Sequence, residues 1–131
     1  MKNKLLISFL LIIAIVACAF NFFVVNVDRK DSAIARYIYK DKNIEVVISA
    51  EDMSVIAEIL DGKFIDIFAL PACGFDENVA VIINNKTFCI ACDVCGTVYL
   101  KERNGYISLE SDENEQLRNI LHDYGFEWPC N

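Results

Sequence analysis

Positive charge is scarce in this chain of 131 residues, which has 12 lysines and arginines against 19 aspartates and glutamates and a formal net charge of −7. Two of the basic residues, Lys2 and Lys4, precede an uncharged stretch that lasts until Asp28. Residues 28–131 therefore carry 10 basic and 19 acidic side chains. A domain with this excess of negative charge repels a phosphate backbone, so the composition argues against nucleic acid as a partner.

Histidine and proline are also scarce. The single histidine, His122, lies between Leu121 and Asp123, off the apolar face of a predicted helix. Such a histidine is more typical of a surface side chain than of a metal ligand. The two prolines, Pro71 and Pro129, each stand shortly before a cysteine, outside the predicted strands and helices.

Residues 5–27 contain no charge, and only Ser8, Asn21 and Asn26 interrupt this 23-residue apolar run. A membrane-spanning helix needs about 20 such residues. Two lysines precede the run, and the four residues that follow it sum to zero charge, so the positive-inside rule places the C-terminal part outside the cell. The sequence predicts a transmembrane anchor or signal segment over residues 1–27 and an extracytoplasmic domain over residues 28–131.

Two other interpretations of the N-terminal segment stay open. Residues 15–18 resemble a lipobox, in which Cys18 would be lipidated and become the mature N-terminus, and residues 17–19 fit ordinary signal cleavage. The apolar run continues past either cleavage point through residues 20–25, which favours an uncleaved anchor. All three interpretations export the domain.

Hydrophobic periodicity predicts an α+β fold for residues 28–131. Apolar residues at helical spacing predict two amphipathic helices, which begin at Ser49 and Ser111 and end near Gly62 and Gly125. Alternating or β-branched runs predict strands over residues 34–39, 44–48, 64–68, 79–83, 87–90, 97–100 and 106–109. Turn residues between these runs, with Gly105 expected at a positive φ, predict hairpins. We expect a mainly antiparallel sheet with both helices on one face.

Five cysteines follow the N-terminal segment, and an exported domain favours disulfides among them. The candidates are Cys73, Cys89, Cys92, Cys95 and Cys130. Five cysteines cannot all pair within one molecule, so one stays free or bridges two chains. The residues alone leave the pairing open.

A metal site is the alternative use of the same cysteines. The spacing Cys92-Asp93-Val94-Cys95-Gly96 has the form of a zinc knuckle, and Cys73, Cys89 and Cys130 could complete four thiolate ligands. The chain lacks a second C-x2-C motif, which weakens this interpretation.

Two further uses of the cysteine cluster fit less well. An iron–sulfur motif would need a fourth cysteine where Tyr99 stands. A thiol–disulfide oxidoreductase would place C-x-x-C at the start of a helix, whereas Cys95 here leads into a predicted strand.

Four segments resemble a group of small uncharacterised bacterial envelope proteins that are exported or membrane-anchored. The segments are residues 71–75 (Pro-Ala-Cys-Gly-Phe), 88–95 (Phe-Cys-Ile-Ala-Cys-Asp-Val-Cys), 101–108 and 124–130 (Tyr-Gly-Phe-Glu-Trp-Pro-Cys). The resemblance implies that Cys73, Cys95 and Cys130 are the more regular positions, which favours a structural role. It implies no activity.

These observations predict a non-enzymatic binding module, anchored in the membrane through residues 5–27 and stabilised by disulfides. Its expected partner is a protein or another ligand of the cell envelope. No catalytic constellation stands out, because the acidic residues at 110–115 fit a solvated helix start and Trp128 fits a core position.

Overall fold

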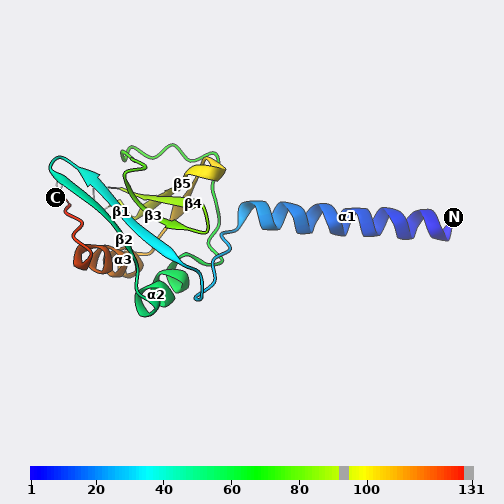
Figure 1. The fold of residues 1–131 in the computed structure, drawn as a ribbon. Coiled ribbons are helices and arrows are strands. Elements are labelled where there is room, and N and C mark those ends of the chain that lie inside the picture. Colours follow the sequence, from blue (N-terminus) through cyan, green and yellow to red (C-terminus); the bar gives the residue numbers. More distant parts are fainter. Residues whose placement is uncertain (92–94, 129–131) are drawn as a thin grey trace.

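In the computed structural model, which describes residues 1–91 and 95–128, one long helix projects from a domain built of a sheet and two further helices (Figure 1). The projecting helix, α1 (Lys2–Phe23), is 22 residues long and apolar, and none of its residues is buried. Its length and composition suffice to cross a membrane.

The domain contains a six-stranded antiparallel sheet in the order β2-β1-β3-β4-β5-β6. The strands are β1 (Ala33–Tyr39), β2 (Lys42–Val47), β3 (Val79–Ile83), β4 (Lys86–Ile90), β5 (Thr97–Leu100) and β6 (Gly105–Ser108). Strands that follow one another in the sequence are also neighbours in the sheet, except β2 and β3. These two are connected by α2 (Ala50–Leu60) and a long loop. The short helix η1 (Lys101–Arg103) joins β5 to β6. The predicted antiparallel α+β architecture is confirmed.

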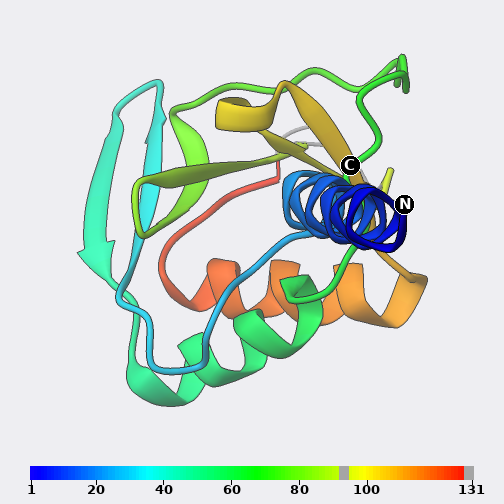
Figure 2. The same ribbon diagram turned by 90° about the vertical axis from the view of Figure 1, so that its right-hand side faces the viewer.

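Both α2 and α3 (Ser111–Asp123) cover the same face of the sheet, where they lie side by side (Figure 2). Alternate residues of β1, β5 and β6 are buried, as the period of two in a strand requires, whereas β3 and β4 have consecutive buried residues. In the central strands Ala35 pairs with Val81, and Val81 pairs with Phe88, so apolar side chains form a continuous row. Met53, Ile56 and Leu60 of α2 and Leu117 and Leu121 of α3 complete the core.

The helix ends follow local capping chemistry. Ser49 caps α2, since its hydroxyl accepts the N–H of Asp52 at 3.2 Å. Helix α3 begins with a capping box that pairs Glu110 with Glu113, a cap that lies one residue before the predicted start. Gly125, at a φ of +96°, ends α3, and the N–H of Phe126 reaches back to the carbonyl of Leu121 at 3.1 Å, a Schellman arrangement.

The apolar N-terminal run divides between two roles. Helix α1 ends at Phe23, and Val24 already pairs with Phe64 in an isolated β-bridge. Val25 and Val27, only 2% and 5% exposed, belong to the core of the domain. The domain therefore follows the helix without a flexible linker.

Two sequence predictions were wrong, the strand over residues 64–68 and the positive φ at Gly105. Residues 64–68 make only single bridges, Phe64 with Val24 and Asp66 with Tyr106, instead of a strand. Gly105 lacks the expected positive φ, which falls on Asn104 instead. A glycine is needed at 105 because a Cβ there would lie 2.3 Å from the side chain of Ile65.

The other face of the sheet is covered in part by the loop between α2 and β3, which runs over β5 and β6 (Figure 1). The ring of Phe75 packs on Tyr99 and Tyr106, with centroids 5.8 and 5.6 Å away. Lys101 and Glu77 form an ion pair at the same loop. The loop is thus part of the folded domain and gives β4–β6 a second packed face.

Candidate functional site

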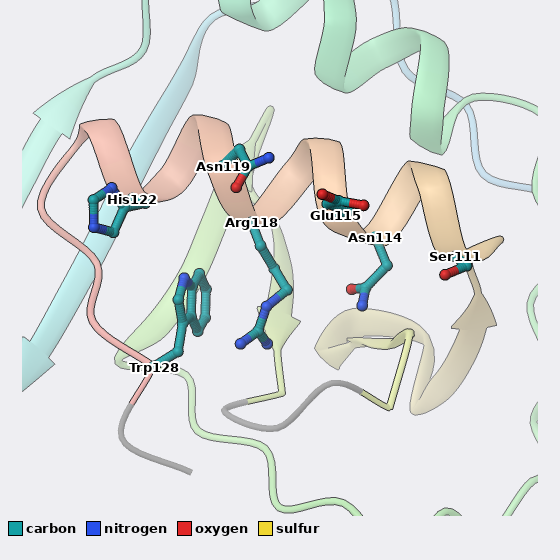
Figure 3. Close-up of a pocket in the computed structure, with 7 residues that line it drawn as sticks. All are labelled: Ser111, Asn114, Glu115, Arg118, Asn119, His122 and Trp128. Carbon is teal, nitrogen blue, oxygen red and sulfur yellow. The ribbon is translucent and has the colours of Figure 1, made fainter. Parts of the chain in front are cut away.

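A polar groove runs along α3 between this helix and the segment that follows it (Figure 3). The cavity measures about 510 Å³. Its lining residues are Ser111, Asn114, Glu115, Arg118, Asn119, His122 and Trp128. Six of these seven lie on α3, so the helix presents one continuous row of polar groups to the groove.

Arg118 and Trp128 contact each other in the lining of the groove. The guanidinium carbon of Arg118 lies 4.2 Å from the centre of the Trp128 ring, within cation–π range. Arg118 is only 8% exposed, and it also donates to the carbonyl of Ala91 at 3.5 Å. The ring of Trp128 also lies next to the ring of Phe126, with centroids 5.8 Å apart. These contacts fix the position of the indole in the groove.

The groove offers hydrogen-bonding groups of every type. Asn114 and Asn119 can both donate and accept, Glu115 accepts, and the hydroxyl of Ser111 can do either. His122 is mainly solvent-exposed, with 70% of its side-chain surface accessible, which agrees with the surface position that the sequence predicts. Such a lining suits recognition of a polar ligand or of a polar protein surface.

The structure pairs Cys73 with Cys95 in a disulfide that spans 22 positions of the sequence. Cys73 lies in the loop that covers β5 and β6, and Cys95 stands two residues before β5. The bond therefore fastens the loop to the sheet. Because Cys95 bonds to Cys73, the C-x-x-C pair of an oxidoreductase is not the pair that forms here.

Cys89 carries a free thiol that is only 1% exposed. It lies on β4 opposite Ala80 and Tyr99, on the face that the loop covers. Burial raises the pKa of this thiol to about 11, and the carboxylates of Glu102 and Glu77 add to the rise. Cys89 is therefore a neutral packing residue, unlike the thiolate of a reactive cysteine.

The remaining predicted cysteine positions are Cys18, Cys92 and Cys130. Cys18 is exposed on α1. Cys92 and Cys130 lie outside the described residues. Within residues 1–91 and 95–128, no group of three His, Cys, Asp or Glu side chains is placed to hold a metal ion. The disulfide also takes two of the five sulfur atoms that the zinc alternative counts as ligands, so a site of four thiolates is incompatible with this bond.

Sequence reasoning missed the groove and the pairing of Arg118 with Trp128. The core position predicted for Trp128 agrees with the structure in part, because its half-buried ring packs against the core and also lines the groove. The sequence predicts no role for Arg118. One signal was present: Arg118 directly follows the core residue Leu117, three positions before the next core residue Leu121. An arginine at the border of an apolar helix face can bury the aliphatic part of its side chain. Its contact with Trp128, ten residues later, forms because the chain reverses direction at Gly125.

Comparisons of the chain with protein-family models, with curated proteins and with solved structures gave no match.

Proposed function

We propose that this protein is a membrane-anchored binding module whose domain faces the outside of the cell and whose ligand contacts the groove on α3. The groove is the observation that carries the proposal, because it combines a cavity of about 510 Å³ with a fixed tryptophan–arginine pair. Tryptophan and arginine are enriched among residues that dominate binding energies at protein interfaces.

The anchor and the disulfide support the location. Helix α1 is apolar and has no buried residue, which suits a lipid environment. Lys2 and Lys4 lie in its first turn, so its N-terminal end belongs in the cytoplasm by the positive-inside rule. A disulfide between Cys73 and Cys95 is typical of an oxidising compartment, which agrees with an exported domain.

The place of the groove supports a role in binding outside the membrane. Helix α3 and the segment after it lie on the side of the domain away from α1 (Figure 1). A partner in the cell envelope can therefore reach the Trp128 end of the groove while α1 stays in the bilayer. The resemblance to small envelope proteins agrees with this role without naming a ligand.

Site-specific photo-cross-linking in whole membranes tests the proposal. A benzophenone amino acid replaces the exposed Asn119 in the groove or, as a control, the exposed Asp76 in the loop on the opposite face of the sheet. We expect a partner adduct from position 119 and none from position 76. Glu115→Arg should abolish the adduct, because it reverses a charge in the groove. Glu58→Arg makes the same change on the exposed surface of α2 and should leave the adduct intact.

Either of two results would count against the groove. The first is equal cross-linking from positions 119 and 76, and the second is an adduct that Glu115→Arg does not reduce.

A further inference from the structure

A second cavity lies where α1 enters the domain. It measures about 350 Å³ and is lined by the end of α1, by the extended residues after it and by side chains from β4 and η1. The polar lining residues are Asn21, Asn26, Lys86 and Arg103. Among the described residues that line this cavity, two have ionisable side chains, Lys86 and Arg103, and both are cationic.

The two cations are held in place by contacts that leave donors for a ligand. Nζ of Lys86 donates to the backbone carbonyl of Asn26 at 2.8 Å, and an ammonium group has three donors. The guanidinium of Arg103 lies 4.7 Å from the centre of the Phe22 ring. The neighbouring carboxylate of Glu102 is turned away, since it accepts from the N–H and the hydroxyl of Thr87 at 2.7 and 2.8 Å. A lysine and an arginine at one cavity form a site for an oxyanion such as phosphate.

The depth of the cavity relative to the bilayer follows from the length of the helix. From Leu5 to Phe23 the helix rises about 28 Å at 1.5 Å per residue, close to the roughly 30 Å of a hydrocarbon core. Val25 is already fixed in the domain, because its N–H bonds to the carbonyl of Lys63 at 2.9 Å. With no linker, Lys86 and Arg103 lie at the level of the lipid headgroups.

Exposed apolar side chains occupy the same side of the domain. Phe64 stacks on Phe23 at 6.3 Å between centroids and is 65% exposed, and Phe68 and Leu70 are 85% and 95% exposed. The segment after α2 that carries them climbs along the side from which α1 leaves (Figures 1 and 2). The carboxylate of Asp66 fixes this segment by accepting the N–H groups of Phe68 and Ala69 at 2.9 and 3.0 Å. Phenylalanine and leucine side chains can enter the boundary between headgroups and acyl chains.

We propose that the domain rests directly on the outer leaflet: the phosphate of an anionic phospholipid headgroup binds between Lys86 and Arg103, and Phe64, Phe68 and Leu70 enter the interface beside it. This inference rests on the proposed membrane anchoring by α1. It adds a lipid site and a fixed orientation, with the groove on α3 turned away from the bilayer.

Quenching of single tryptophans by brominated lipid tests the proposal on the full chain. The protein is reconstituted in vesicles of phosphatidylglycerol and brominated phosphatidylcholine in equal parts, on a Trp128→Phe background that leaves no other tryptophan. Phe68→Trp reports the interface, Phe9→Trp reports insertion of α1, and Tyr39→Trp at the far end of β1 is the control. We expect strong quenching at positions 9 and 68 and little at position 39.

The outcomes separate the two proposals. Quenching at position 9 with position 68 no different from position 39 overturns the lipid contact and leaves the anchor intact. Absence of quenching at position 9 overturns the anchor itself, and the lipid site with it.

Charge variants test the phosphate site in the same vesicles. The double variant Lys86→Gln with Arg103→Gln should reduce quenching at position 68. Each lost cation should lower the ratio of domains in contact with the membrane surface to domains away from it by about fivefold. Arg29→Gln with Lys40→Gln removes the same charge elsewhere and should not. Equal loss in both pairs would show general attraction to the anionic surface and overturn the assignment to Lys86 and Arg103.

Discussion

The hydroxyl of Tyr124 donates a 2.6 Å hydrogen bond to Oδ2 of Asp52 and accepts one from the backbone N–H of Ser49 at 2.9 Å. Tyr124 is the C-cap of α3, whereas Ser49 and Asp52 form the N-terminal cap of α2. One side chain thus joins the end of one helix to the start of the other. The contact sets the position of α3 over the sheet, and with it the position of the groove.

Tyr124→Phe should therefore destabilise the domain. The substitution keeps the ring but removes both hydrogen bonds, one of them to a carboxylate, and we expect a loss of about 1–2 kcal/mol. For a domain of this size the melting temperature should fall by several degrees. Thermal unfolding of the full chain in detergent, followed by circular dichroism, measures it.

Tyr39→Phe is the matched control, since Tyr39 is 41% exposed on β1. Equal melting temperatures for the Tyr124→Phe variant and this control would show that the hydroxyl of Tyr124 adds nothing to stability.

The disulfide should contribute more than any single hydrogen bond. Cys73→Ser or Cys95→Ser opens a loop whose ends are 22 positions apart, and the cost in the free energy of unfolding is about 3 kcal/mol. The double variant should be no less stable than either single variant, because one bond is lost in all three. Cys18→Ser, on the exposed face of α1, should leave the melting temperature unchanged.

A chelator separates this structural role from the zinc alternative. We expect no change in melting temperature on addition of a chelator under oxidising conditions. A large drop would mean that metal binding supplies folding free energy, and the disulfide assignment would then be wrong.

The general architecture could be predicted because its signals are local. The cap at Ser49, the stop at Gly125 and the alternation in the strands each act within a few residues, and each was confirmed. Residues 64–68 alternate like a strand but make only two bridges, to Val24 just after α1 and to Tyr106 of β6. That outcome depends on tertiary packing, which periodicity does not encode.

The sites could be predicted only in part, for the same reason. Spacing alone could not pair Cys73 with Cys95, because the partners meet only when the loop folds over β5 and β6. The cavity at Lys86 and Arg103 combines residues from α1, β4 and η1. The apolar run through Val27 suggested a longer membrane segment, whereas the sheet and helices supply a buried place for Val25 and Val27.

The buried thiol of Cys89 should make stability depend on pH in the alkaline range. Its pKa is about 11 in the folded chain against an ordinary value of 9.0, so the unfolded chain loses the proton first as the pH rises. Stability from this group is complete below pH 9 and decreases between about pH 9 and 11. Urea unfolding as a function of pH should show a shallower decline for Cys89→Ala than for the wild type. Identical slopes would show that the thiol does not titrate with the raised pKa.

Reporter fusions test the orientation of the chain. Alkaline phosphatase, which is active only after export, should be active when fused after residue 131. Changing Lys2 and Lys4 to glutamate removes the charge bias and should lower the exported fraction, whereas the same change at Lys40 and Lys42 should not. Low activity of the unmodified fusion would place the domain in the cytoplasm and remove the basis for the lipid site.

The last prediction concerns Cys18, where the anchor and lipoprotein interpretations differ. The residue lies within α1, five positions before its end, and the domain is already fixed at Val24. Lipobox cleavage would leave only a few residues between a lipidated Cys18 and the domain, so both interpretations hold the domain at the membrane. We expect the uncleaved anchor, because an unbroken helix of 22 residues suffices to span the bilayer. Cys18→Ala should then remain in the membrane at the size of the wild type, as judged by gel mobility after alkaline extraction. A longer precursor in the variant, together with loss of lipid labelling, would show instead that the wild type is cleaved and lipidated at Cys18.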